Sequence, residues 1–266
     1  MIVSPASKPA IVITGASSGI GRELALRAAR DADNLVLIAR SAAPMQALAA
    51  EIHATGKAAR ILPLDITIQG AGEQVDAFLS ENGLYCDILV NNAGYGLLGP
   101  AAALDRADQL GIIDVNVHAL TGFTLRFLPG MIARKHGGVL NVASVAGFLP
   151  GPNMAIYYAS KAYVLSFSEA LWEETRNSGV TISCLCPGPV ETPFFERAGA
   201  RKSRMFRDPG KMSAETCARI GWDGFMAGKR VVVAGFSNRL ITTLMPFLPQ
   251  RLLLFVVHRM QKKRMQ

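Results

Sequence analysis

The chain has 266 residues, of which 50% are hydrophobic and 18% are charged, and its formal net charge is +8. This length and composition suffice for one large globular domain with its own core. Nine basic residues in two clusters are enough to account for the positive excess. Basic surfaces that bind single-stranded nucleic acid interleave several aromatic rings, and neither cluster holds more than one, so we expect no nucleic-acid partner. The clusters are Arg201, Lys202, Arg204 and Arg207, and Arg251, Arg259, Lys262, Lys263 and Arg264.

The remaining composition indicates neither a metal site nor a secreted protein. Cys86, Cys184, Cys186 and Cys217 form no CxxC pair, a pattern typical of buried free thiols in a reducing compartment. The histidines are scattered without the spacing of metal ligands, so we expect no metal. The first fifteen residues lack the basic start and long apolar stretch of a signal peptide, which favours a cytoplasmic location.

The first predicted elements are a strand, a glycine-rich turn and a helix. PAIVITG (9–15) is an apolar, β-branched run typical of a buried parallel strand, and Leu24, Ala25 and Ala28 then share one helical face. Between them, TGASSGIG (14–21) carries three glycines that would let the backbone approach a pyrophosphate at the helix N-terminus. The spacing is GxxxGxG rather than GxGxxG, so a plain tight turn remains an alternative.

Arg40 ends the second predicted strand, NLVLIAR (34–40), where a dinucleotide fold meets the adenosine ribose. An acidic residue there would bind the 2′-hydroxyl of NAD. A guanidinium instead suits the 2′-phosphate of NADP(H), which it can hold with paired, charge-assisted hydrogen bonds. We therefore predict NADP(H), with a solvated charge at the strand end as the alternative.

Two more predicted strands end in polar residues. ARILPLD (59–65) ends at Asp65, and CDILVNNAG (86–94) ends in a polar, glycine-containing stretch. Since ligands bind outside the carboxyl ends of parallel strands, these residues are candidates for adenine and ribose contacts. The alternation of strands and helices without a linker-like break predicts one α/β domain over 1–266, a Rossmann-like doubly wound parallel sheet with helices on both faces.

Tyr157 and Tyr158 precede Lys161 by four and three residues. On a helix both spacings bring a phenol beside an ammonium, and this geometry alone does not separate the two tyrosines. An ammonium nearby would favour the phenolate and lower the pKa of the phenol, which makes such a pair a usable proton donor.

Together these segments resemble the short-chain dehydrogenase/reductase (SDR) family. The matching motifs stand in the family's order and span about two thirds of the chain. They are TGASSGIG (14–21), LDIT (64–67), NNAG (91–94), VNVHAL (115–120), VLNVASVAG (139–147), YYASK (157–161) and PGPVET (187–192).

The resemblance implies a catalytic tetrad and a set of cofactor contacts. The family pattern of tyrosine, three residues and lysine selects Tyr157 over Tyr158, which then has a packing role. The implied tetrad is Asn116, Ser144, Tyr157 and Lys161. The implied nicotinamide-dinucleotide contacts are Gly15, Ser17, Ser18, Gly19, Ile20, Gly21, Arg40, Asp65, Ile66, Asn92, Ala93, Gly94, Tyr157, Lys161, Pro187, Gly188, Val190 and Thr192.

By this resemblance, hydride passes between the nicotinamide and a carbonyl carbon while Tyr157 transfers the proton. Lys161 would tune the phenol and bind the nicotinamide ribose, and Ser144 would donate a hydrogen bond to the substrate oxygen. Asn116 would hold a water that links Lys161 to solvent. The family also commonly forms dimers or tetramers through long helices, for which Gly122, Ala159 and Ala162 offer small surfaces.

The region after the motifs predicts the substrate class only coarsely. A mixed-charge segment at about 190–212 suggests a mobile flap, whose Phe194, Phe195 and Phe206 could cover an apolar alcohol or ketone. Its basic residues could meet an anionic group or remain solvated. Phe148, Leu149 and Met154 are expected to line the same pocket.

An apolar and basic extension follows at about 238–266. Pro246, Pro249 and Arg251 interrupt its apolar run, so it is too short to span a bilayer. It could pack over the pocket, pack against another subunit, or dock at an anionic lipid surface. The overall prediction is an NADP(H)-dependent oxidoreductase acting on an apolar substrate, mainly as a reductase. A non-catalytic NADPH-binding sensor or scaffold is the alternative.

Overall fold

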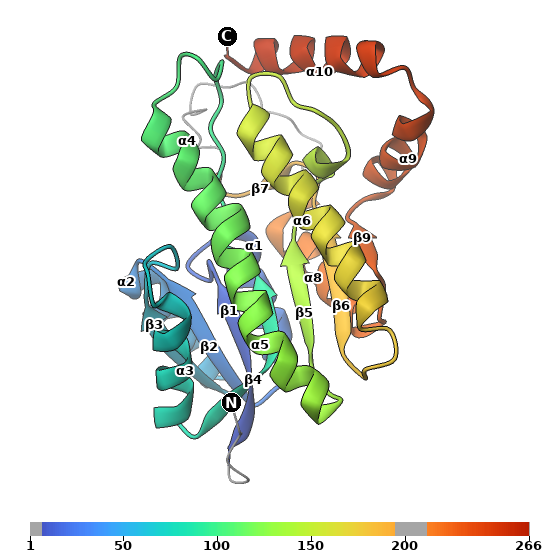
Figure 1. Ribbon diagram of the computed structural model, residues 1–266. Helices are drawn as coiled ribbons and strands as arrows, with labels where there is room; N and C mark the ends of the chain where they lie inside the picture. Colours follow the sequence, from blue (N-terminus) through green and yellow to red (C-terminus); the bar gives the residue numbers. More distant parts are fainter. Residues whose placement is uncertain (1–6, 195–211, 266) are drawn as a thin grey trace.

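The computed structural model describes residues 7–194 and 212–265, and Figure 1 shows a parallel sheet between two layers of helices. The seven strands lie in the order β3-β2-β1-β4-β5-β6-β9, and every pair is parallel. The order reverses between β1 and β4, and ligands of such sheets bind at this reversal, outside the carboxyl ends of the strands. The strands are β1 (Lys8–Thr14), β2 (Asn34–Ala39), β3 (Ala58–Pro63), β4 (Leu84–Asn91), β5 (Gly138–Val142), β6 (Thr181–Cys186) and β9 (Val231–Val233).

Alternate residues of β1 face opposite helical layers, because successive side chains of a strand point to opposite faces. Ile11 and Ile13 join the core beneath α1, α2 and α8, whereas Ala10 and Val12 join the core beneath α3, α5 and α6. Burial on both faces explains the unbroken apolar runs of the sequence, and the doubly wound α/β fold is confirmed. The covering helices are α1 (Gly19–Ala28), α2 (Ala42–His53), α3 (Ala71–Glu81), α5 (Leu120–Arg134), α6 (Ala155–Glu174) and α8 (Ala214–Met226).

Shorter elements surround the carboxyl ends of the strands. A small second sheet pairs β7 (Val190–Glu191) with β8 (Met212–Ser213). The other elements are α4 (Arg106–Ile113), the π-helix η1 (Asp114–Ala119), the 3-10 helices η2 (Val145–Phe148) and η4 (Met245–Phe247), α9 (Phe236–Leu244) and α10 (Gln250–Met265). Figure 1 shows α10 at the end of the molecule toward which the central strands point.

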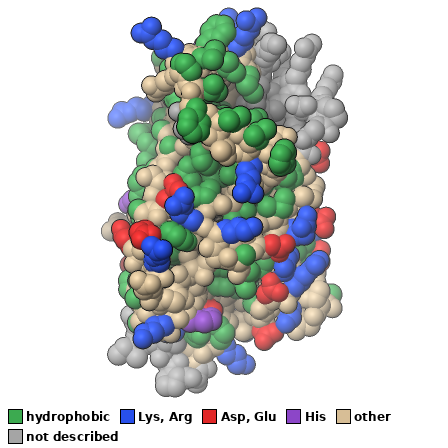
Figure 2. All heavy atoms as spheres, turned by 90° about the vertical axis from the view of Figure 1, so that its right-hand side faces the viewer, with side chains coloured by type: hydrophobic (Ala, Val, Ile, Leu, Met, Phe, Trp, Pro, Cys, Tyr) green, Lys and Arg blue, Asp and Glu red, His purple; other side chains and the backbone are tan. Residues whose placement is uncertain are grey.

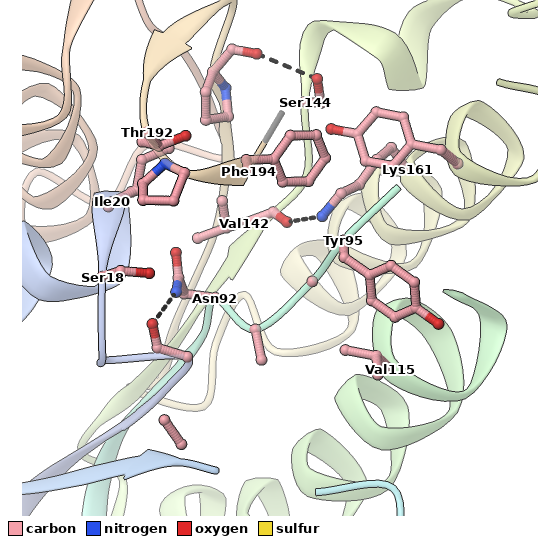
Figure 3. A pocket seen from close by; sticks show the side chains of 18 of the residues that line it. Ser18, Ile20, Asn92, Tyr95, Val115, Val142, Ser144, Lys161, Thr192 and Phe194 are labelled. Atoms are coloured by element: carbon pink, nitrogen blue, oxygen red, sulfur yellow. Dashed lines mark hydrogen bonds between the residues drawn. The ribbon is translucent and has the colours of Figure 1, made fainter. Parts of the chain in front are cut away.

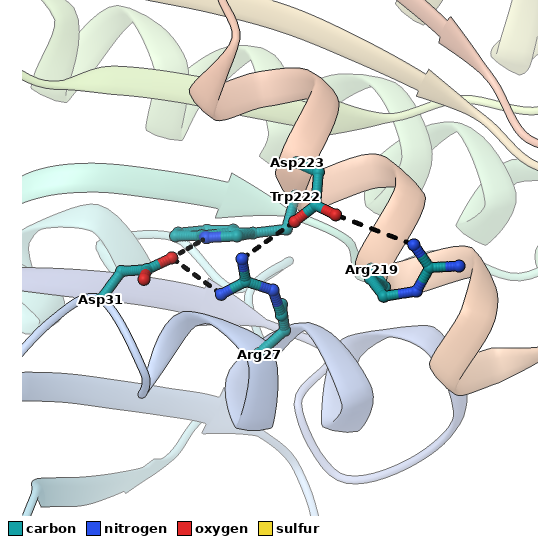
Figure 4. Close-up of polar contacts among 5 residues, drawn as sticks. All are labelled: Arg27, Asp31, Arg219, Trp222 and Asp223. Carbon is teal, nitrogen blue, oxygen red and sulfur yellow. Dashed lines mark hydrogen bonds and ion pairs between the residues drawn. The ribbon is translucent and has the colours of Figure 1, made fainter.

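A polar network joins α1 to α8 across nearly the whole sequence (Figure 4). The fully buried indole of Trp222 donates from Nε1 to Oδ2 of Asp31 over 2.7 Å. Arg27 donates to Asp31 over 2.8 Å and to Asp223 over 2.9 Å, and Arg219 lies 3.9 Å from Asp223. Because each polar group has a partner, the large indole can be buried between the helices without an unpaired N–H.

Candidate functional site

A cavity of about 700 Å³ lies at the carboxyl ends of the sheet strands. It runs from the glycine turn and the end of β2 to Tyr157 and Phe194, and Figure 3 shows side chains from both regions facing it. Every predicted tetrad and cofactor residue lines this cavity except Gly21 and Asn116, which lie behind its wall.

The glycine turn is shaped by contacts that leave no room for side chains. Gly15 has a left-handed φ of +66°, and a Cβ there would lie 2.8 Å from Cα of Ala93. A Cβ on Gly21 would overlap the carbonyl oxygen of Gly15 and the amide of Asn92. Gly21 therefore lets α1 approach the strands rather than lining the cavity.

The amide of Asn92 holds this turn in place. Its Nδ2 donates to the carbonyl oxygens of Thr14 and Gly15 over 3.0 and 3.2 Å. Ser18 precedes α1 and makes no side-chain cap, and the first turn of α1 carries no acidic residue. The amino end of the helix is therefore left open toward the cavity with its positive dipole end uncompensated, as anion binding requires.

At the other side of the turn, exposed Arg40 follows β2 and lines the cavity beside Asp65. Hydrogen bonds to Asp65 from the hydroxyl of Thr67 (2.7 Å) and its backbone N–H (3.0 Å) lower the pKa of that carboxyl, and the charge of Arg40 adds a smaller effect. Ser41 also lines the cavity, precedes α2 and makes no side-chain cap. Sequence reasoning missed Ser41, although a serine directly before a helical stretch was the available signal.

At the opposite end, Ser144, Tyr157 and Lys161 converge on the cavity (Figure 3). Ser144 ends the segment after β5, where its Oγ accepts from the N–H of Ala146 over 3.1 Å and donates to the carbonyl oxygen of Pro187 over 3.3 Å. Lys161 is only 4% exposed, and its Nζ donates to the carbonyl oxygen of Val142 over 2.7 Å. The ammonium lies 5.9 Å from the centre of the Tyr157 ring.

Burial dominates the protonation of this pair. It raises the pKa of Tyr157 to about 12, and the hydrogen bond with Ser144 acts in the opposite direction. It also lowers the pKa of Lys161 to about 8, against the influence of Cys184 and Cys186. The expectation that Lys161 lowers the pKa of the phenol is therefore wrong for the protein alone, because desolvation outweighs the ammonium.

Asn116 lies in the π-helix η1 and is fully buried. Its Nδ2 donates to the carbonyl oxygen of Tyr95 and to Oγ of Ser160, each over 3.0 Å, and its Oδ1 accepts from the N–H of Tyr95 over 3.1 Å. A Cβ on Gly94 would lie 3.0 Å from Oδ1 of Asn116 and 3.4 Å from Nζ of Lys161. Asn116 thus braces the wall around Lys161, and its predicted contact with water stays a prediction.

Tyr158 has the packing surroundings expected of it. Its ring occupies the space next to Gly151, where any Cβ would collide with it. Its hydroxyl accepts a hydrogen bond of 2.8 Å from Nε2 of Gln261 in α10. The C-terminal helix is therefore tied to the residue beside Tyr157.

A family model described as short chain dehydrogenase matches residues 9–203, about three quarters of the chain. The chain belongs to the short-chain dehydrogenase family. A very-long-chain 3-oxoacyl-CoA reductase of Mycosarcoma maydis is 36% identical over 226 residues, which are 82% of this chain and 63% of that protein. The chain thus spans less than two thirds of this curated relative.

Two solved SDR structures differ in the cofactor they contain. A short-chain dehydrogenase from Sphingobium yanoikuyae in complex with NADPH matches with a TM-score of 0.79 and 30% identity, over 91% of this chain and 97% of that one. An SDR from Burkholderia phymatum in complex with NAD matches with a TM-score of 0.78 and 27% identity, over 92% and 94%. The family thus establishes a nicotinamide-dependent oxidoreductase.

The predicted apolar lining of this SDR is correct only in part. Met154 and Phe194 line the cavity, and the ring of Phe194 lies 5.3 Å from that of Tyr157. Phe148 instead packs against the core around Val164, and neither it nor Leu149 lines the cavity. Phe195, Phe206 and the basic residues at 201–207 lie outside the described residues, as does most of the predicted flap.

Proposed function

We propose that this SDR is an NADP(H)-dependent oxidoreductase that interconverts a hydroxyl and a carbonyl on an apolar substrate, mainly as a reductase. The observation that carries the proposal is one continuous cavity with the glycine turn at one end and Ser144, Tyr157 and Lys161 at the other. Its volume of about 700 Å³ falls in the range of small-molecule and cofactor sites.

The residues of the cavity fit a nicotinamide dinucleotide. The missing side chains of Gly15 and Gly19 and the open amino end of α1 favour a pyrophosphate at the turn. Arg40 and Ser41 at the start of α2 favour a phosphate on the adenosine ribose, which supports NADP(H) over NAD. The bound cofactor would supply or accept hydride at the Tyr157 end.

The chain's own groups would manage the proton. With a pKa of about 12, Tyr157 is protonated at neutral pH, as a proton donor for reduction must be. An alkoxide is a stronger base than this phenolate, since even water ionises only near pKa 15.7, so proton transfer from Tyr157 is downhill. Ser144 would orient the carbonyl oxygen, and Lys161, still mostly charged at neutral pH, would stabilise the phenolate left behind.

The cavity walls support an apolar substrate. Met154 and Phe194 lie beside Tyr157, and burial of apolar groups against them would favour binding. The named activity of the Mycosarcoma maydis relative, reduction of a very-long-chain 3-oxoacyl-CoA, supports a ketone within a long apolar chain. NADPH as the cofactor would favour the reductive direction.

A homo-oligomer through α5 and α6 belongs to the same proposal. Gly122 and Ala159 are exposed on these helices, close to Leu125, which is 56% exposed. Leu125→Arg would place a charge on the self-contacting face, so we expect light scattering to report a smaller assembly than for the unmodified protein. An unchanged mass would rule out this face as the interface.

Substitution of single tyrosines on α6 tests the catalytic assignment. NADPH consumption would be followed over a panel of apolar ketones and 3-oxoacyl thioesters. We expect Tyr157→Phe to lose turnover by about 10²–10⁴-fold, the usual contribution of a positioned acid, while Tyr158→Phe keeps most of it. Tyr163→Phe makes the same chemical change outside the cavity, where the hydroxyl contacts Thr121, and serves as the matched control. Full turnover by Tyr157→Phe would refute the assignment, and no turnover of any carbonyl by the unmodified protein would favour the sensor alternative.

A further inference from the structure

The C-terminal elements α9, η4 and α10 expose an unusual amount of apolar surface. Ten of the seventeen large hydrophobic side chains exposed in the described residues belong to residues 236–260. The most exposed are Phe236 at 83%, Phe247 at 82% and Phe255 at 60%. Figure 2 shows hydrophobic side chains gathered over the upper part of the molecule, where Figure 1 shows α9 and α10.

On α10 the exposed apolar residues form one face. Leu252, Phe255, Val256 and Met260 follow the i, i+3, i+4, i+8 spacing and are all exposed, whereas Val257 and Gln261 on the inward side are buried. The helix is therefore held by its inner side, through Gln261 and Tyr158, while an apolar stripe faces outward. A surface helix normally has the reverse arrangement, with its polar face toward water.

On α9 the pattern is repeated. Phe236, Leu240, Ile241 and Leu244 are all at least half exposed, and Thr242 is the buried residue of the helix. Phe247 and Leu248 continue the apolar surface from α9 toward α10. These exposed side chains of residues 236–260 are called the C-terminal apolar face below. Exposed apolar surface that is contiguous over several elements usually marks an interaction site.

The charges around this face are all positive. Residues 236–266 contain six lysines and arginines and no aspartate or glutamate. Arg239, Arg251, Arg259 and Lys262 are exposed, and none forms an ion pair with another described residue. An apolar face with unpaired basic groups along it complements a surface that offers both acyl chains and anionic headgroups.

Two other occupants fit less well. No helix within residues 7–194 and 212–265 is long and apolar enough to cross a bilayer. A second copy of the chain would bring the same basic groups of two subunits together across a two-fold axis, and such like-charge contacts are unfavourable. The chemistry that remains is the surface of an anionic lipid bilayer.

We propose that the C-terminal apolar face docks this protein on an anionic lipid bilayer, with the aromatic side chains of α9, η4 and α10 entering the acyl boundary. The basic side chains along it then contact the headgroups. This goes beyond the proposed reaction and does not depend on it. Because Gln261 of α10 bonds to Tyr158 of the cavity wall, docking would hold the cavity close to the lipid.

Co-sedimentation with vesicles tests the proposal. The full chain would be mixed with phosphatidylcholine vesicles, with or without about one third phosphatidylserine, at low and high salt. We expect at least tenfold tighter binding to the anionic vesicles, weakened by salt. Phe236→Ser/Phe247→Ser/Phe255→Ser should weaken binding at least tenfold, and so should replacement of Arg239, Arg251, Arg259 and Lys262 by glutamine.

Matched controls separate docking from general stickiness. Met226→Ser/Ile132→Ser removes exposed apolar side chains elsewhere, and Lys135→Gln/Lys229→Gln removes exposed charges elsewhere, so both should bind vesicles like the unmodified protein. The proposal is overturned if the full chain binds neither kind of vesicle, or if the triple phenylalanine variant binds as well as the unmodified protein. It is also overturned if the triple variant changes only the self-association of the protein in the absence of lipid. NADPH turnover of a water-soluble ketone without vesicles reports the proposed function separately.

Discussion

Replacing Lys161 by methionine should change how the stability of the protein depends on pH. Burial lowers the pKa of Lys161 from 10.5 to about 8, so between these values the unfolded chain binds more protons than the folded protein. The free energy of unfolding therefore gains a contribution that grows as pH rises through about 8 and is complete near 10.5. Below pH 8 both states are protonated, and this contribution is absent.

The magnitude follows from the same shift. One pH unit above the folded pKa, the contribution reaches about 1 kcal/mol, because each unit of pKa difference corresponds to about 1.36 kcal/mol. Tyr157 does not disturb this window, since its pKa lies between 10 when unfolded and about 12 when folded. Lys161→Met also leaves the carbonyl oxygen of Val142 without its donor, but that loss does not vary with pH.

Urea unfolding at pH 7 and pH 9 measures the effect. We expect the difference in unfolding free energy between the unmodified protein and Lys161→Met to increase by about 1 kcal/mol in favour of the unmodified protein. Lys229→Met, at an exposed lysine, should track the unmodified protein at both pH values. If the difference between Lys161→Met and the unmodified protein is the same at pH 7 and pH 9, Lys161 is not desolvated and the reasoning fails.

Two further predictions concern the cofactor and the core. Arg40→Ala should weaken NADPH binding by about 10–100-fold in a fluorescence titration, the usual loss for a hydrogen bond to a charged group, and leave NADH binding nearly unchanged; tighter binding of NADH than of NADPH by the unmodified protein would remove the role of Arg40. Trp222→Ala should lower the unfolding free energy by about 3–5 kcal/mol through the cavity and the orphaned Asp31, and should not alter Tyr157-dependent turnover per folded molecule. A loss below 1 kcal/mol in urea unfolding would contradict the packing described for α1 and α8.

The parts of the fold that were predicted correctly are those set by local pattern. The apolar strands end within a few residues of their expected ends, and Leu24, Ala25 and Ala28 are the buried face of α1 as their spacing indicated. The four cysteines are buried free thiols. The choice of Tyr157 over Tyr158 came from the family pattern alone, since both follow the spacing of one helical face.

What could not be predicted depends on contacts between distant residues. The indole of Trp222 meets Asp31 across 191 residues, and no local pattern encodes that distance. Phe148 was misplaced because the turn η2 directs it into the core around Val164. The pKa of Tyr157 moves upward because the folded protein removes water from the phenol, and burial of a single side chain cannot be read from the spacing of its neighbours.

The bond between Gln261 and Tyr158 makes the last helix part of the wall that encloses the reaction. Deleting α10, or straining it with a bulky fusion, would leave the Tyr158 hydroxyl without this donor and free its ring to turn beside the proton donor. Activity measured on a shortened chain would then describe an altered enzyme, in which the neighbour of Tyr157 had already shifted before any substrate arrived.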